Sequence, residues 1–367
     1  MLGGATFTII FLYIYGWLIT LIGARHTLLV TSLFSSVVIV FIYFAVKSGI
    51  SISAWFLYSF REAYVVVVIE QYWSLINSTL REDQAKKFNG PITGFGSIGA
   101  IIGSLTVGFA AKKIHTEPLL LLTALSLLPA ALCSELAYRF GGEPAPSTEE
   151  KGKKSLAISL FKDSSYLRRI ALLIFLTQII STVLDLRFSG LVQDFLPIKD
   201  ERTAYLGMFS FRFNLIAGIL QFIVAPILLR FVSIKFIHPS IPIIHVATAV
   251  ILFIKPNLFT GGLAYLVFKA FDYSIFRASK EIFYMPLSFD SRYRAKEVID
   301  AFGYRASKGI SAGLTSFATM ISGFFGYMVS GGAYPITAAI SAVIWLLTVT
   351  GLVKQHDRIL KQSDKND

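Results

Sequence analysis

Long apolar stretches separated by short polar turns make up most of this chain. Eleven stretches of about 20 residues are apolar enough to cross a bilayer, which requires about 20 residues of helix. They cover approximately residues 5–22, 28–46, 55–79, 90–111, 118–138, 167–187, 204–230, 236–254, 258–285, 297–323 and 335–353. Because backbone polar groups in lipid must be hydrogen-bonded within the protein, each stretch is predicted to be a helix. The pattern predicts an all-α polytopic membrane protein with about 11 transmembrane helices.

One polar segment divides the chain. Residues 141–165 are rich in Gly, Pro, Glu and Lys, which is typical of a linker rather than a span. The predicted organisation is an N-terminal helical bundle over 1–140, a linker over 141–165, a C-terminal bundle over 166–353 and a polar tail over 354–367.

The two halves resemble each other when one is displaced by 210 positions. Glu62 then falls on Asp272, and four further pairs are identical in residue type: Ala85 with Ala295, Lys86 with Lys296, Gly99 with Gly309, and Gly103 with Gly313. Such internal repetition is typical of transporters whose site lies between the repeats. The spacing of Gly96, Gly99 and Gly103 also predicts close packing between helices.

Composition supports a membrane protein and excludes several other classes. Apolar residues make up 54% of the chain, charged residues 15%, and the mean hydropathy is +0.66. The single cysteine, Cys133, and five scattered histidines show no metal-ligand spacing. No phosphate-binding loop or catalytic motif is present. We therefore expect no enzyme activity, no cofactor and no metal.

The positions of the basic residues predict the orientation. If the linker is cytoplasmic, loops on that side carry 20 Lys and Arg and the opposite loops carry six. Cytoplasmic loops are normally the more basic. The linker and the C-terminus are therefore predicted to be cytoplasmic and Met1 to lie outside. This topology explains the net charge of +12 without a nucleic-acid partner.

Eight basic residues remain after the loops are counted, and they lie within the predicted spans together with six acidic residues at comparable depth. Each costs about 2.5 kcal/mol or more there unless it has a partner, water or a ligand. The basic ones are Arg61, Arg187, Arg212, Lys269, Arg277, Lys280, Arg305 and Lys308. The acidic ones are Glu62, Glu70, Asp185, Asp272, Glu281 and Asp300. Snorkelling or structural ion pairing is the simplest interpretation of any one of them. The surplus of positive charge, however, indicates an anionic ligand.

Two sets of these residues are candidates for the site. Those expected to bind the anion are Arg61, Arg212, Arg277, Lys280, Arg305 and Lys308. Those expected to form ion pairs that change between states are Glu62, Glu70, Asp272 and Asp300. Arg offers a fork of donors to a phosphate and Lys a single charged contact.

Two segments resemble the ATP:ADP antiporter (nucleotide transporter) family. Residues 284–308, YMPLSFDSRYRAKEVIDAFGYRASK, are similar to its tenth-to-eleventh helix region. Residues 70–77, EQYWSLIN, followed by Ala85-Lys86 and by glycines at 94, 96 and 99, are similar to its fourth-to-fifth helix region. Because the loop at Arg25 is similar to the turn after the family's second helix, we expect the family's first helix to be missing.

The resemblance implies a major-facilitator-like fold of two bundles in a bacterial inner membrane. It also implies exchange of nucleotides by alternating access, with the nucleotide as the anionic partner. Two alternatives remain open. One is a proton-coupled transporter of another solute, with Glu62 or Glu70 as the proton carrier. The other is a structural or lipid-handling relative that does not transport.

Overall fold

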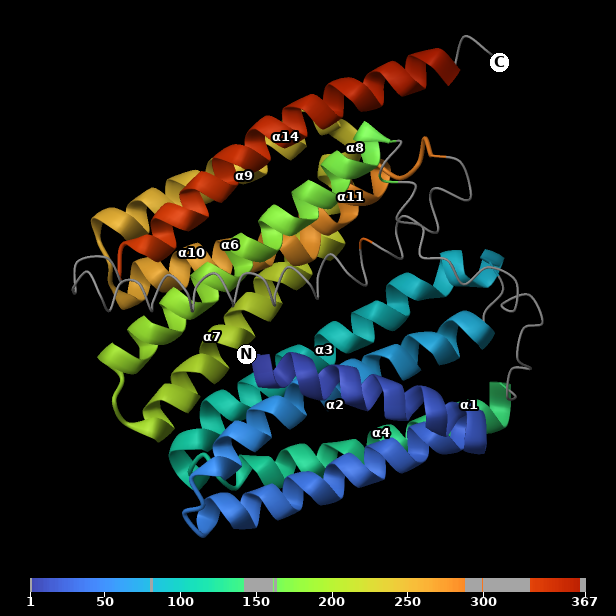
Figure 1. Cartoon of the computed structure of the whole chain (residues 1–367), viewed down its shortest axis with the longest axis vertical. Coiled ribbons are helices and arrows are strands. Elements are labelled where there is room, and N and C mark those ends of the chain that lie inside the picture. The colour runs from blue at the N-terminus through green and yellow to red at the C-terminus, as the bar shows by residue number, and fades with distance from the viewer. Residues whose placement is uncertain are drawn as a thin grey trace. The chain divides into compact units, whose positions relative to one another are not determined.

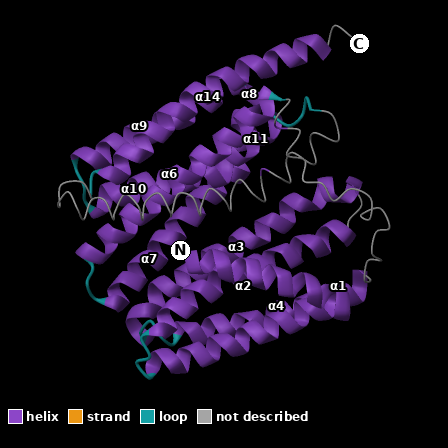
Figure 2. Cartoon of the chain, viewed as in Figure 1, coloured by secondary structure: helices purple, strands orange, loops and turns teal. Residues whose placement is uncertain are grey.

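The computed structural model describes residues 2–79, 82–141, 161, 164–287, 299 and 331–363. All regular elements in these ranges are helical (Figures 1 and 2). They comprise α1 (Leu2–Lys47), α2 (Ile52–Thr79), α3 (Glu82–Ile114), α4 (Leu119–Gly141), α6 (Ser165–Phe195), α7 (Lys199–Ile219), η2 (Leu220–Val224), α8 (Ala225–Phe231), α9 (Ile234–Ile254), α10 (Leu258–Phe271), η3 (Asp272–Phe276), α11 (Arg277–Ile282) and α14 (Ala333–Ser363). The two η elements are π-helical turns.

The predicted fold class is confirmed. Within the described ranges, eight helical stretches are long and apolar enough to cross a membrane. Ten of the eleven predicted spans coincide with helices, and the span predicted at 297–323 lies outside the described residues except for Ile299. The chain is an all-α polytopic membrane protein.

The helices pack as two compact units. One comprises Met1–Lys153 together with Ile198–Met208, and the other comprises Lys154–Pro197 together with Phe209–Asp367. The first turns of α7 therefore pack with the N-terminal helices, and the rest of α7 packs with the C-terminal ones.

Helix α1 contains the first two predicted spans, joined by a sharp bend. The bend lies at Gly23, whose φ of 76° and ψ of 166° are accessible almost only to glycine. Beyond the bend, Arg25 forms a bidentate ion pair with Glu135 of α4, and Arg139 reaches the same carboxylate at 3.1 Å. The break that the sequence predicts after residue 22 therefore lies at Gly23, and the helix that follows it is tied to α4 through Arg25.

The N-terminal unit packs around α1, α2 and α4. Its main buried cluster consists of Ile39, Ile42, Phe60, Ala124 and Leu127. Ser36 Oγ donates a 2.9 Å hydrogen bond to the Ala124 carbonyl oxygen, which joins α1 to α4. In lipid, association of helices depends on such close packing and polar contacts, because the surrounding chains are as apolar as the helix surface.

The C-terminal unit packs around α6, which lies against α10 and α14, while α9 lies against α10 and α14. Its core includes Ile170, Ile180, Phe268, Phe276 and Trp345. Figure 1 shows α9 and α14 running side by side within this unit. Side-chain caps begin its helices, with Ser164 before α6, Ser233 before α9 and an Asn257–Thr260 capping box before α10.

Close packing at the predicted glycines is not observed. A Cβ added to Gly96, Gly99 or Gly103 would meet no described atom within 4 Å. No described helix approaches these α3 glycines, so their close packing stays a prediction. The glycine of α3 that does approach another backbone is Gly108, whose partner is Gly207 of α7. The predicted counterparts Gly309 and Gly313 lie outside the described residues.

Candidate functional site

The site is built on a helix that is interrupted at its middle. The predicted span at 258–285 consists of α10, the π-helical turn η3 and α11 in direct succession. A π turn replaces the i→i+4 backbone bond with an i→i+5 bond, and such turns are frequent at functional sites. Turn η3 packs against the second π turn, η2, which interrupts the helix formed by α7 and α8.

The π turn changes which side chains share a face. In a regular α-helix, residues five apart point roughly 140° away from each other. The wider turn at η3 brings Arg277 closer to the face of Asp272. Lys269 precedes Asp272 by three residues and Lys280 follows Arg277 by three, which is the spacing of neighbours on a helix face. The result is a charged stripe formed by Lys269, Asp272, Arg277 and Lys280.

The electrostatics agree with this geometry. The Asp272 carboxylate interacts with the charges of Lys269, Lys280 and Arg277. Its Oδ1 atom is buried and has no hydrogen-bond partner among the described residues. Lys280 is 4% exposed and the Arg277 residue is exposed. One acid and three bases give the charged stripe a net charge of +2, which suits an anionic ligand.

Lys269 was not among the residues predicted to bind the ligand. Its Nζ atom donates a 2.9 Å hydrogen bond to Ser181 Oγ of α6 and lies 5.6 Å from the ring centroids of both Tyr265 and Tyr273. Hydroxyl and ring faces both stabilise an ammonium group in a partly buried position. In the sequence, the feature that singles out Lys269 is its three-residue spacing to Asp272. That spacing favours a structural ion pair rather than a ligand contact.

Aromatic rings surround Lys269 on several elements. Tyr265 stacks on Phe188 of α6 and on Phe209 of α7, at centroid distances of 5.4 and 6.0 Å. Tyr273 meets Phe213 of α7 edge to face at 5.7 Å. These contacts position the rings of Tyr265 and Tyr273, whose faces attract the Lys269 ammonium.

Within the C-terminal unit, the structure brings together three of the predicted residues. Asp272, Arg277 and Lys280 share the charged stripe. Arg61 and Glu62 belong to α2 in the other unit, where they form an ion pair with each other, and Arg61 lies 5.7 Å from the Tyr58 ring.

Of the remaining predicted residues, Arg212 is the one whose side chain is described. Arg212 of α7 is exposed and forms no ion pair with a described residue. Glu70 lies on α2, but its side chain is not described, and Asp300, Arg305 and Lys308 lie outside the described residues. Among the side chains that are described, no group of three or more His, Cys, Asp or Glu gathers in a metal-binding arrangement.

The fold and the charged stripe define an integral all-α membrane protein with an ionic site inside one helix. A family model described as TLC ATP/ADP transporter matches residues 255–356, a segment that contains the whole charged stripe. The chain is 22% identical over 336 residues to ADP,ATP carrier protein 1 of Rickettsia conorii, covering 80% of this chain and 67% of that protein. It is 24% identical over 320 residues to ADP,ATP carrier protein 3 of Rickettsia bellii, covering 72% and 63%. The predicted resemblance to the ATP:ADP antiporter family is thereby confirmed.

Proposed function

We propose that this protein is a secondary transporter that exchanges nucleotides of the ATP and ADP type across a membrane. The observation that carries the proposal is the position of the charged stripe within residues 255–356, the segment that matches the ATP/ADP transporter family. The names of its relatives, ADP,ATP carrier proteins, support a nucleotide as the substrate.

The stripe supplies the chemistry that a nucleotide requires. The guanidinium of Arg277 offers two parallel donors to a phosphate, and the Lys280 ammonium offers a compact charge beside it. Asp272 partly neutralises these cations while the site is empty, and phosphate oxygens replace its contacts when the nucleotide binds. Lys269 keeps its hydrogen bond to Ser181 and provides positive potential at the end of the stripe opposite Lys280.

The other predicted residues complete the proposal. Arg61, Arg212, Arg305 and Lys308 contribute further contacts to the anion during alternating access, and Glu62, Glu70 and Asp300 form ion pairs that differ between states. Opposed nucleotide gradients supply the free energy, so no covalent step is needed. The protein acts in a bacterial inner membrane with its linker and C-terminus in the cytoplasm.

Exchange in proteoliposomes tests the proposal. Purified protein is reconstituted with ADP inside, and uptake of labelled external ATP is measured against vesicles loaded with buffer alone. The expected result is rapid uptake only when ADP is present inside. Equal uptake with and without internal ADP would contradict exchange.

Two further measurements separate the alternatives. Uptake that follows an imposed pH gradient and ignores internal nucleotide would identify a proton-coupled transporter, and Glu62→Gln or Glu70→Gln would then abolish it. Neither binding nor uptake of any nucleotide or phosphorylated metabolite would indicate a relative that does not transport.

A further inference from the structure

The first turns of α7 meet α3 through their backbones. A Cβ added to Gly207 would overlap the backbone of Gly108, and a Cβ added to Gly108 would lie 3.0 Å from the Met208 nitrogen. Only glycine at both positions allows two helices to approach this closely. The charge distribution predicts that this end of the helices, with Lys112, Lys113, Lys199 and Arg202, is extracytoplasmic.

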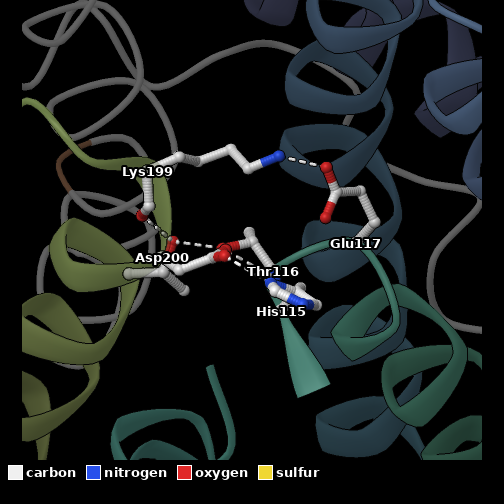
Figure 3. Close-up of polar contacts among 6 residues, drawn as sticks. His115, Thr116, Glu117, Lys199 and Asp200 are labelled. Atoms are coloured by element: carbon white, nitrogen blue, oxygen red, sulfur yellow. Dashed lines mark hydrogen bonds and ion pairs between the residues drawn. The ribbon is translucent and has the colours of Figure 1, made fainter. Parts of the chain in front are cut away.

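A polar cluster closes the same contact at the turn between α3 and α4 (Figure 3). Asp200 Oδ1 accepts hydrogen bonds from the Thr116 backbone nitrogen at 2.8 Å and from Thr116 Oγ1 at 2.6 Å. His115 Nδ1 lies 2.7 Å from Asp200 Oδ2, and Lys199 forms an ion pair with Glu117. The turn and the start of α7 are therefore joined side chain to side chain.

The turn is strained in a way that depends on this cluster. His115 has a φ of 66°, in the left-handed region that residues other than glycine adopt at a cost. Such conformations persist where surrounding contacts hold them. The contacts of the Asp200 carboxylate with His115 and Thr116 provide that support. Loss of Asp200 would therefore allow the backbone at His115 to change its conformation.

Two features of this contact make it easy to separate. The side chains of His115 and Lys199 are 73% and 52% exposed, so water can replace their ionic partners. Among the described residues the apolar part is small: Ala111, Leu119 and Ala204 are buried, and Val107 and Ala110 are partly buried against them. By contrast, the other unit buries a continuous apolar core along α6. Regions with few buried apolar contacts and water-exposed polar bonds open first.

We propose that this contact is a releasable latch, which holds Lys199–Met208 against α3 and α4 in the described state and opens during each transport cycle. We define the latch as Gly108, His115, Thr116, Glu117, Lys199, Asp200, Thr203 and Gly207. The proposal rests on the transport function proposed above. It assigns Asp200 a positioning role, since its carboxylate holds the turn without contacting the substrate.

A reversible cross-link tests whether the latch must open. Thr116 Oγ1 lies 3.0 Å from Thr203 Oγ1, so cysteines at both positions, in a Cys133→Ala background, are within reach of a disulfide. Oxidation of the Thr116→Cys/Thr203→Cys variant is expected to abolish exchange, and reduction to restore it. The single-cysteine variants, which cannot form the bond, are the matched controls and keep their activity under oxidation. Full exchange by the completely cross-linked protein would overturn the latch.

A distance measurement tests the latch without relying on the substrate. Spin labels are placed at Lys113→Cys and Glu201→Cys, two exposed positions that flank the latch and make none of its bonds. The expected result is a short and a long distance in reconstituted protein, with Asp200→Ala increasing the long fraction. One short distance in the wild-type background and in Asp200→Ala would overturn the latch. If the labels show both distances but the protein exchanges no nucleotide, the latch proposal is supported and the proposed substrate is refuted.

Discussion

Lys269 of α10 donates a 2.9 Å hydrogen bond to Ser181 of α6, and this bond joins the charged stripe to the buried centre of the C-terminal unit. A lysine in an apolar span requires partners, and Lys269 has the hydroxyl, the two tyrosine rings beside it and the Asp272 carboxylate. The bond explains how α6, which carries no residue of the charged stripe, can influence it.

The first prediction concerns this pair. Lys269→Met removes one of the three positive charges from the stripe, so nucleotide affinity should fall about tenfold, the equivalent of about 1.4 kcal/mol. Ser181→Ala keeps the charge and should cause a smaller loss. Competition binding with ATP measures both. Lys255→Met, at the exposed turn before α10, is the control and should bind normally.

The second prediction concerns the phosphate contacts. Arg277→Ala and Lys280→Ala should each lose one charge-assisted contact, worth about 1.5–3 kcal/mol or roughly ten- to a hundredfold in affinity. The same loss is predicted from sequence for Arg305→Ala and Lys308→Ala, with partial activity in Lys308→Arg. Competition binding with ATP measures the affinities, and exchange of ATP for ADP measures the activity. Wild-type affinity in the folded Arg277 and Lys280 variants would assign the stripe a structural role.

The third prediction concerns the bend in α1. Gly23→Ala forces a Cβ onto a backbone with φ of 76° and ψ of 166°, which should destabilise the fold by about 1–3 kcal/mol. The thermal midpoint in detergent is the measurement. Gly96→Ala is the control, because its Cβ would meet no described atom within 4 Å, and the change should be neutral or slightly stabilising. An equal response of the two variants would contradict the strain at Gly23.

The fourth prediction concerns pH. The hydrogen bond from the Lys199 ammonium lowers the pKa of the Glu117 carboxyl below its ordinary value. A carboxyl with a lowered pKa in the closed contact stabilises that contact above its ordinary pKa of about 4.3, and the stabilisation is lost as pH falls further. The long distance between labels at 113 and 201 should therefore gain population as pH falls below about 4. Glu117→Gln should reduce this dependence, and an unchanged dependence would exclude Glu117 as its source.

The fifth prediction concerns orientation. Single cysteines at Ser147, Lys255 and Ser363, in a Cys133→Ala background, are exposed to an impermeant thiol reagent on intact cells. The predicted topology allows labelling at position 255, in the turn before α10, because that turn lies outside. Positions 147 and 363 are protected, because the linker and the C-terminal tail are cytoplasmic. The reverse pattern would invert the topology and place the latch on the cytoplasmic side.

The sequence by itself determined the class of protein and the positions of its helices. Hydropathy averaged over about 20 residues reports whether a segment can cross lipid, and lipid permits only a helix there. For that reason the stretch predicted at 118–138 corresponds closely to α4, while those predicted at 28–46 and 335–353 lie within α1 and α14. The charged residues Asp272, Arg277 and Lys280 could likewise be identified from the sequence, because each interrupts an apolar run.

Only the tertiary structure decided which of these residues meet. The one-residue change of register at η3, set against η2, aligns Arg277 with Asp272, and no local pattern encodes it. The close approach of Gly108 to Gly207, rather than of Gly99 or Gly103, depends on how two helices are rotated about their axes. Asp200 reaches His115 across 85 residues of sequence. Helix spans are local properties of the chain, whereas these contacts depend on the relative rotation and depth of helices, which packing alone sets.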